Sequence, residues 1–187
     1  MKMIGNYIKH LSASNEPLSA DVYLIDGNKY CYVYDVGNND ESLSIIEGIS
    51  KDKVIILSHY HQDHVGNVDK LQFRELYVGN LTYETIGKGT VVEDSYMIHD
   101  GITIEIKHCP SPHVSGSLIV TINKEYTLIA DLYFTRQVYD TALASEMLNT
   151  LESIDTKYFV VSHQVETSIF EKEYLINELK EYFNYGS

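Results

Sequence analysis

Runs of apolar residues divide the chain into short strands and a few helices. The unbroken run "KVIIL" at 53–57 predicts a strand buried on both faces, because four apolar residues follow one another without alternation. "DVYLIDGNKYCYVYDVG" at 21–37 predicts a hairpin that turns at Asp26-Gly27-Asn28. Further strands are predicted at 75–80 and 157–163, and two more hairpins at 96–109, with an Asp100-Gly101 turn, and at 117–131.

Helical spacing of apolar residues accounts for most of the remaining chain. It predicts helices at 38–49, where Asn39 or Asp40 is the expected cap, and at 141–154. A short helix is predicted at 81–87, and a helical turn after His64. An amphipathic helix is predicted at 168–183, where Ser168 and Glu171 fit a capping box. The whole pattern predicts one mixed α and β domain over residues 1–187.

Composition and charge narrow the possible partners. The chain has 187 residues, 44% of them hydrophobic, and a formal net charge of −13. Such a charge repels phosphate backbones, so nucleic acid is not expected as a partner. The start "MKMIGNYIKH" has no signal-peptide pattern and no run is long enough for a membrane span, so we expect a cytoplasmic protein. Cys31 and Cys109 are expected as free thiols, with a disulfide as the alternative.

A cluster of ligand-type side chains follows the buried strand. "LSHYHQDHVGN" places His59, His61, Asp63 and His64 within six positions. His59 and His61 point the same way if the backbone is extended, and Asp63 and His64 fall on the next turn. This arrangement suits two adjacent metal ions better than one, and imidazole and carboxylate are ligands that Zn²⁺ accepts.

This H-x-H-x-D-H motif resembles the signature of the metallo-β-lactamase superfamily. Other segments are similar to family elements in the same order along the chain, namely "CYVYDVG", "CPSPHVSGSLIV", "YTLIAD" and "KYFVVSHQ". The resemblance implies a four-layer αβ/βα sandwich of two mixed sheets, with helices on the outer faces and the site at the strand ends.

The resemblance also implies a ligand set. His59, His61 and His113 would hold one metal ion, Asp63, His64 and His163 a second, and Asp131 would bridge them. Asp35 would be a supporting carboxylate that orients an imidazole. The implied cofactor is two Zn²⁺ per chain, with iron or manganese as alternatives. Asp63 and Asp131 are the implied catalytic carboxylates, beside a hydroxide that bridges the ions.

Departures from the family pattern are few. Ala130 stands where glycine is common before the bridging aspartate, and Ser162 and Gln164 flank His163 where glycines are frequent. These positions affect backbone room rather than ligand identity. His10, His99 and His108 are not expected in the site. Tyr60, Tyr133, Phe134 and Tyr139 are candidates for lining a substrate pocket, with ordinary packing as the equal alternative.

The expected activity is hydrolysis of a small ester, thioester or lactone. Three classes within the family have features that this sequence does not show. Lactam hydrolases of the best-known subclass have cysteine at the position of Asp131, and lactonases often have a tyrosine where Phe134 stands. Glyoxalase II thioesterases add a helical C-terminal domain. The alternatives are a phosphodiesterase, a diiron oxidoreductase, which usually has glutamate at the position of His61, and a non-catalytic metal-binding protein. The expected partner is a small-molecule substrate, and a homodimer is an alternative that the sequence does not decide.

Overall fold

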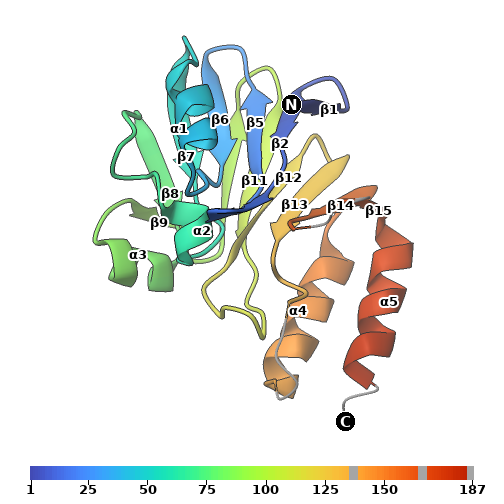
Figure 1. The fold of residues 1–187 in the computed structure, drawn as a ribbon. Coiled ribbons are helices and arrows are strands. Elements are labelled where there is room, and N and C mark those ends of the chain that lie inside the picture. Colours follow the sequence, from blue (N-terminus) through green and yellow to red (C-terminus); the bar gives the residue numbers. More distant parts are fainter. Residues whose placement is uncertain (135–138, 164–167, 185–187) are drawn as a thin grey trace.

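Two β-sheets lie face to face with helices outside both of them (Figure 1). A computed structural model describes residues 1–134, 139–163 and 168–184. The first sheet has the spatial order β1 (Lys2–Ile4), β2 (Ile8–Leu11), β5 (Val22–Asp26), β6 (Tyr30–Tyr34), β7 (Asp52–Ile56), β8 (Glu75–Val78) and β9 (Thr90–Val91). The second has the order β10 (Ser95–His99), β11 (Thr103–His108), β12 (Leu118–Ile122), β13 (Tyr126–Ala130), β14 (Tyr158–Val161) and β15 (Ile169–Glu171). A ribbon of β3 (Ser14–Asn15) and β4 (Leu18–Ser19) lies beside the first sheet.

Helices cover the outer faces, and three apolar layers hold the sandwich together. The first sheet carries α1 (Asp40–Glu47), α2 (Gln62–Val65) and α3 (Asn80–Ile86), and the second carries α4 (Thr141–Ser153) and α5 (Lys172–Asn184). The central layer joins the inner faces of both sheets, for example Ile56 with Leu118 and Val160. The prediction of a four-layer sandwich with two mixed sheets is confirmed.

Each sheet contains parallel pairs whose carboxyl ends meet at one edge. In the first sheet β6 and β7 are parallel, and in the second β13 and β14 are parallel. The residues that follow these strands therefore emerge side by side. The prediction that "KVIIL" is buried on both faces is confirmed, because Val54 to Leu57 are at most 2% exposed. This burial fixes β7 between the outer helical layer and the central apolar layer.

Local sequence explains most of the observed elements. The predicted hairpin at 21–37 is β5 and β6, and the two later hairpins are β10–β11 and β12–β13. Asn39 caps α1, because its side chain accepts from the Ser42 N–H at 2.8 Å. Within the described ranges no helix has the length and apolarity needed to cross a bilayer. Cys31 and Cys109 are both free, and they lie in different apolar layers.

The predicted start of the last helix is wrong. Residues Ile169–Glu171 form β15, which pairs with β14, and the helix begins at Lys172. The backbone groups of this segment bond to the sheet, as in the 2.8 Å bond from Val161 N to Ser168 O. Ser168 and Glu171 therefore do not form a capping box. Hydrogen bonding to the preceding strand, β14, outweighed a local capping pattern.

Candidate metal centre

Two groups of ligand-type side chains meet at the strand ends between the sheets. One group is His59, His61 and His113, and the other is Asp63, His64, Asp131 and His163. Within each group the ligand atoms lie within 4.8 Å of one another. All seven predicted ligands are thus brought together, and they fall into the two predicted sets with Asp131 on the side of the second.

Strand ends and one short helix place these side chains. His59 follows β7, His61 precedes α2, and Asp63 and His64 lie in α2. Asp131 follows β13 and His163 follows β14, so the parallel pair of the second sheet delivers both. His113 comes from the loop between β11 and β12. The two sheets therefore contribute to both groups.

The first group is three imidazoles at close range. His61 Nδ1 lies 3.0 Å from His59 Nε2 and 3.1 Å from His113 Nε2. His113 Nδ1 can donate to the carbonyl oxygen of Phe134 at 3.0 Å, which leaves Nε2 unprotonated and aimed at the group. Burial, aided by the other imidazoles, lowers the pKa of His59 well below its usual value, and burial also lowers the pKa of His61 and His113. Neutral imidazoles with converging lone pairs suit a divalent cation.

Asp35 fixes the orientation of His64 in the second group. Its carboxylate accepts from Ser58 N, Ser58 Oγ and His64 Nδ1, each at 2.8 Å. His64 Nε2 then faces Asp131 Oδ2 at 3.2 Å. Burial would lower the pKa of His64, but the Asp35 and Asp131 carboxylates outweigh it and raise that pKa to about 10. The expected supporting role of Asp35 agrees with this geometry.

Asp63 and His163 complete the second group. His163 Nε2 lies 3.1 Å from Asp63 Oδ2 and 3.5 Å from Asp131 Oδ2. The hydrogen bond to Asp63 raises the pKa of His163. Burial would raise the pKa of Asp63, but His163 and His64 lower it. Asp63 is therefore a carboxylate at neutral pH.

Asp131 provides the test of whether a cation fits here. The residue is 5% exposed, and its buried Oδ1 has no hydrogen-bond partner among the residues that the structure describes. Its Oδ2 lies 3.2 Å from His64 Nε2 and 3.9 Å from His113 Nε2, which places it between the two groups. A buried, unpartnered carboxylate oxygen is costly unless a cation or proton satisfies it. The residues present therefore fit a metal pair.

Several sequence departures now have a structural meaning. Ala130 has φ 45° and His163 has φ 58°, in the left-handed region that favours glycine. Ser162 Oγ donates to Asp21 Oδ2 at 2.8 Å. Gln164 lies outside the described residues.

The structure also places residues for which no site role was predicted. Ser58 Oγ lies 2.9 Å from His59 Nδ1 while it donates to Asp35, so it links a ligand of the first group to the carboxylate that orients His64. Asp21 accepts from the backbone N–H of His163 at 2.8 Å, and His10 pairs with Asp21. Ser58 directly precedes the H-x-H-x-D-H motif, and this position in the sequence could have indicated its role in the site. Asp21 and His10 have none, because their partners are distant in the chain.

The remaining candidates separate into two classes. Tyr60 packs against His61, with ring centroids 5.1 Å apart, and the 38% exposed Phe134 lies 6.1 Å from the His163 ring. Tyr133 donates to the Ser162 carbonyl oxygen at 2.9 Å. Tyr139 instead packs on Phe183 in the outer helical layer, which agrees with ordinary packing. His10, His99 and His108 are in neither ligand group.

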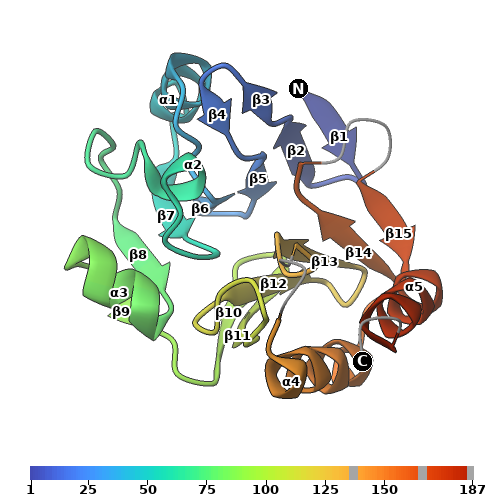
Figure 2. The same ribbon diagram turned by 60° about the horizontal axis from the view of Figure 1, so that its bottom comes forward.

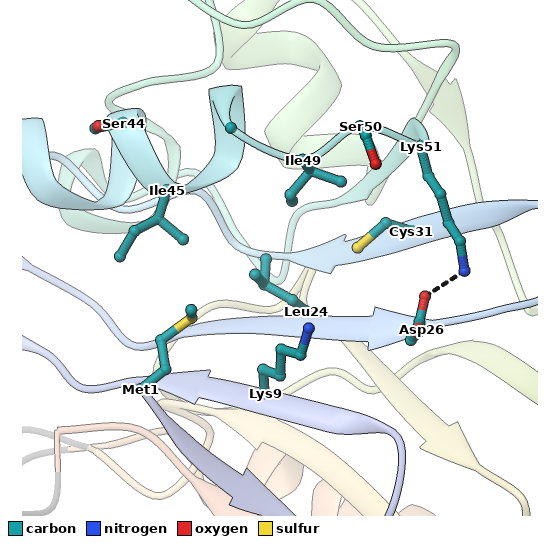
Figure 3. A pocket seen from close by; sticks show the side chains of 11 residues that line it. Met1, Lys9, Leu24, Asp26, Cys31, Ser44, Ile45, Ile49, Ser50 and Lys51 are labelled. Carbon is teal, nitrogen blue, oxygen red and sulfur yellow. Dashed lines mark hydrogen bonds and ion pairs between the residues drawn. The ribbon is translucent and has the colours of Figure 1, made fainter.

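A separate cavity is not part of this centre. It has a volume of about 460 Å³ and lies between α1 and the outer face of the first sheet (Figure 3). Leu24, Cys31 and Ile45 contribute to its wall, and the Lys51 ammonium at its rim is already paired with Asp26 at 2.5 Å. Lys51 precedes β7, so this cavity approaches the end of the sheet opposite to the ligand groups.

Comparison with known proteins agrees with the fold and the motif. Residues 15–78 match the family model described as the metallo-beta-lactamase superfamily. A hydroxyacylglutathione hydrolase of Serratia proteamaculans is 33% identical over 90 residues, covering 46% of this chain and 34% of that protein. The chain thus spans about a third of the length of this curated relative.

Two solved structures share the architecture at low identity. A flavoprotein of Thermotoga maritima superposes with a TM-score of 0.71 at 14% identity, covering 94% of this chain and 61% of that one. A metallo-β-lactamase superfamily protein of Sulfolobus tokodaii gives 0.70 at 17% identity, covering 95% and 86%. The motif and the family match over residues 15–78 resemble the metallo-β-lactamase superfamily, and the fold is that of its solved members.

Proposed function

We propose that this protein is a metal-dependent hydrolase that holds two Zn²⁺ ions, one in each ligand group, and cleaves a small ester, thioester or lactone. The observation that carries the proposal is the convergence of seven ligand-type side chains into two groups, with Asp131 Oδ2 within 3.9 Å of an imidazole of each group and its buried Oδ1 without a partner among the described residues. A bound pair of Zn²⁺ ions lowers the pKa of water towards ~7 and polarises a carbonyl oxygen. The superfamily and the distant hydroxyacylglutathione hydrolase support hydrolysis at this level.

The side chains of the centre prepare it for this chemistry. Asp35 holds the proton of His64 on Nδ1, and the Phe134 carbonyl oxygen holds that of His113 on Nδ1, so both Nε2 atoms face inward. Asp63 and Asp131 are the carboxylates placed to accept a proton from the attacking water and to return it to the leaving group. Fixed carboxylates and imidazoles of this kind need little rearrangement during reaction.

The surroundings support a small substrate with an apolar part. Tyr60 beside His61 and Phe134 beside His163 offer aromatic surface at both ligand groups. The net charge of −13 disfavours a polyanion. A thioester is the first candidate within the class, since the curated relative is named for hydrolysis of a glutathione thioester.

The test combines metal analysis with a substrate panel. Protein purified without added metal is assayed for zinc, iron and manganese, and then with aryl esters, thioesters, lactones and bis-p-nitrophenyl phosphate. We expect close to two equivalents of zinc and turnover of a carbonyl substrate. Iron with a visible absorption band would favour the redox alternative, because imidazole and carboxylate also suit iron.

Asp131→Ala is the decisive variant for the site. We expect kcat/KM to fall by more than about 100-fold, since loss of even an outer partner of a metal ligand costs about 10- to 100-fold. Asp155→Ala is the matched control, because Asp155 is an exposed carboxylate that forms an exposed ion pair with Lys124. Equal activity of the two variants on every substrate would contradict the proposal.

A further inference from the structure

A buried carboxylate binds the backbone of His163. Asp21, directly before β5, is 2% exposed. Its Oδ2 accepts from the backbone N–H of His163 and from Ser162 Oγ, both at 2.8 Å. These two bonds hold the turn that leaves β14, and they come from a residue 142 positions away in the other sheet.

The turn needs such a partner. His163 has φ 58°, a left-handed backbone conformation that non-glycine residues rarely adopt without support from their surroundings. Ser162 N donates to the Ala130 carbonyl oxygen at 3.1 Å, and Ala130 itself has φ 45°. Two adjacent strand ends are thus held in uncommon conformations, and Asp21 binds the N–H of the one that carries the imidazole.

His10 in turn fixes Asp21. The His10 Nε2 atom pairs with Asp21 Oδ1, and the ring is 6% exposed and stacked on Tyr23 with centroids 4.8 Å apart. Tyr23 also reaches the end of β14, because its hydroxyl donates to the Val161 carbonyl oxygen at 3.3 Å. Figure 2 shows β2 and the end of β14 near each other at this edge of the molecule. Residues of the first sheet therefore hold the end of β14, the segment of the second sheet that carries His163.

We propose that Asp21, held by His10, is a positioning residue that fixes His163 against Asp63 and Asp131 and thereby sets the metal affinity of the second ligand group. The inference rests on the proposed function, because it requires that this group bind a metal ion. Asp21 acts through the main chain of the ligand, unlike Asp35, which bonds to the ligand ring. The first group has no contact with Asp21 and keeps its affinity.

The experiment measures both metal equivalents in the full chain. Metal-free wild type and Asp21→Ala are titrated with Co²⁺, followed by its visible absorption, and with Zn²⁺ against a chromophoric chelator. We expect wild type to bind two equivalents. In Asp21→Ala one equivalent binds as in wild type, and the second binds about 10- to 100-fold more weakly, the range seen for partners of metal ligands.

Three further variants separate positioning from general damage. Asp21→Asn can present one oxygen to the His163 N–H and its amide to His10, so it is expected to restore much of the second equivalent. His10→Phe keeps the stack on Tyr23 but loses the bond to Asp21, and weakens the second equivalent alone. Asp100→Ala is the control, since Asp100 is a buried carboxylate that accepts from the backbone N–H groups of Lys29 and Tyr30 at a distant turn, and it leaves both equivalents unchanged.

The outcomes are distinguishable. If Asp21→Ala does not fold, the result with His10→Phe decides. Two equivalents of wild-type affinity in a folded Asp21→Ala or His10→Phe variant would overturn the inference and leave the proposed function intact. Equal weakening of both equivalents would also overturn it. A wild-type protein that binds no ion would overturn the inference together with the proposed function.

Discussion

At the scale of single residues, the two ligand groups differ in the pKa values of their imidazoles. Burial keeps His59, His61 and His113 neutral, whereas carboxylates raise the pKa of His64 and His163. The sequence motif predicted which side chains meet, but not this difference. The proton balance depends on Asp35 and Asp131, whose distances from His64 are set by the fold.

Binding of metal to the second group is therefore predicted to release protons. A ligand imidazole must be unprotonated, and His64 in the metal-free protein has a pKa of about 10. Between ~6.5, the ordinary histidine value, and that pKa, the affinity of the second equivalent should rise with pH while that of the first stays flat. Calorimetric titration at pH 7 in two buffers of different ionisation enthalpy measures the protons released. Release of the same number of protons by both metal equivalents would contradict the prediction that only the second group is protonated before metal binds.

The same shift has a consequence for the stability of the metal-free protein. A raised pKa means that the folded state binds the proton more tightly than the unfolded chain, so the stabilisation is complete below ~6.5 and disappears as the pH rises through about 10. Denaturant unfolding in the presence of a chelator should give a lower free energy of unfolding at pH 10 than at pH 7. The comparison with His64→Gln isolates this residue.

At the scale of elements, local patterns were sufficient where a segment's partners are close in sequence. The three predicted hairpins and the helix capped by Asn39 are of this kind. β1, β2 and β15 were not predicted, because strands this short with mixed exposure carry little periodicity. The contact of His10 with Asp21 was not predicted either, because it depends on how β2 and the residue before β5 lie against the end of β14.

The loop that carries His113 depends on a close approach between two glycines. A Cβ added to Gly79 would lie 1.9 Å from the carbonyl oxygen of Gly116, so Gly79→Ala must displace this loop. We expect a loss of about 1–3 kcal/mol in stability, typical of overpacking, and weaker binding of the metal equivalent that uses His113. Thermal unfolding and Co²⁺ titration measure the two effects.

Gly48→Ala is the matched control for this substitution. Gly48 has φ −67°, and its nearest atom to an added Cβ is the Ser44 carbonyl oxygen at 3.3 Å. Its unfolding temperature should stay close to that of wild type. If Gly79→Ala behaved like Gly48→Ala in both measurements, the contact with Gly116 would not position His113.

At the scale of the whole molecule, the ligand groups join the two sheets. His59 and His61 come from the first sheet and His113 from the second, and the other group is divided in the same way. The fold class and the ligands His113, Asp131 and His163 were predicted through resemblance to a family, whereas the spacing within the His59–His64 segment by itself indicated a metal site. Hydrophobic patterns alone predicted strands and helices without their order in space. That order follows from pairing between distant strands, which periodicity does not encode.

Metal removal is accordingly expected to destabilise the whole domain. A cation that binds only the folded state adds about 2.7 kcal/mol when its concentration is 100 times Kd, and about 2–4 °C per kcal/mol is usual for this chain length. The unfolding temperature should therefore fall by roughly 5–11 °C per ion removed. Calorimetry with and without a chelator tests this. Unchanged unfolding would show that the groups hold no ion under those conditions.

The division of each ligand group between the two sheets has a consequence for the newly made chain. The His59–His64 segment is synthesised before the residues that complete its groups: His113, from the loop between β11 and β12, completes the first group, and Asp131 and His163, which follow β13 and β14, complete the second. Under the proposed function, ion binding would then be a late step in folding, because a chain with only one sheet assembled presents only part of each ligand group.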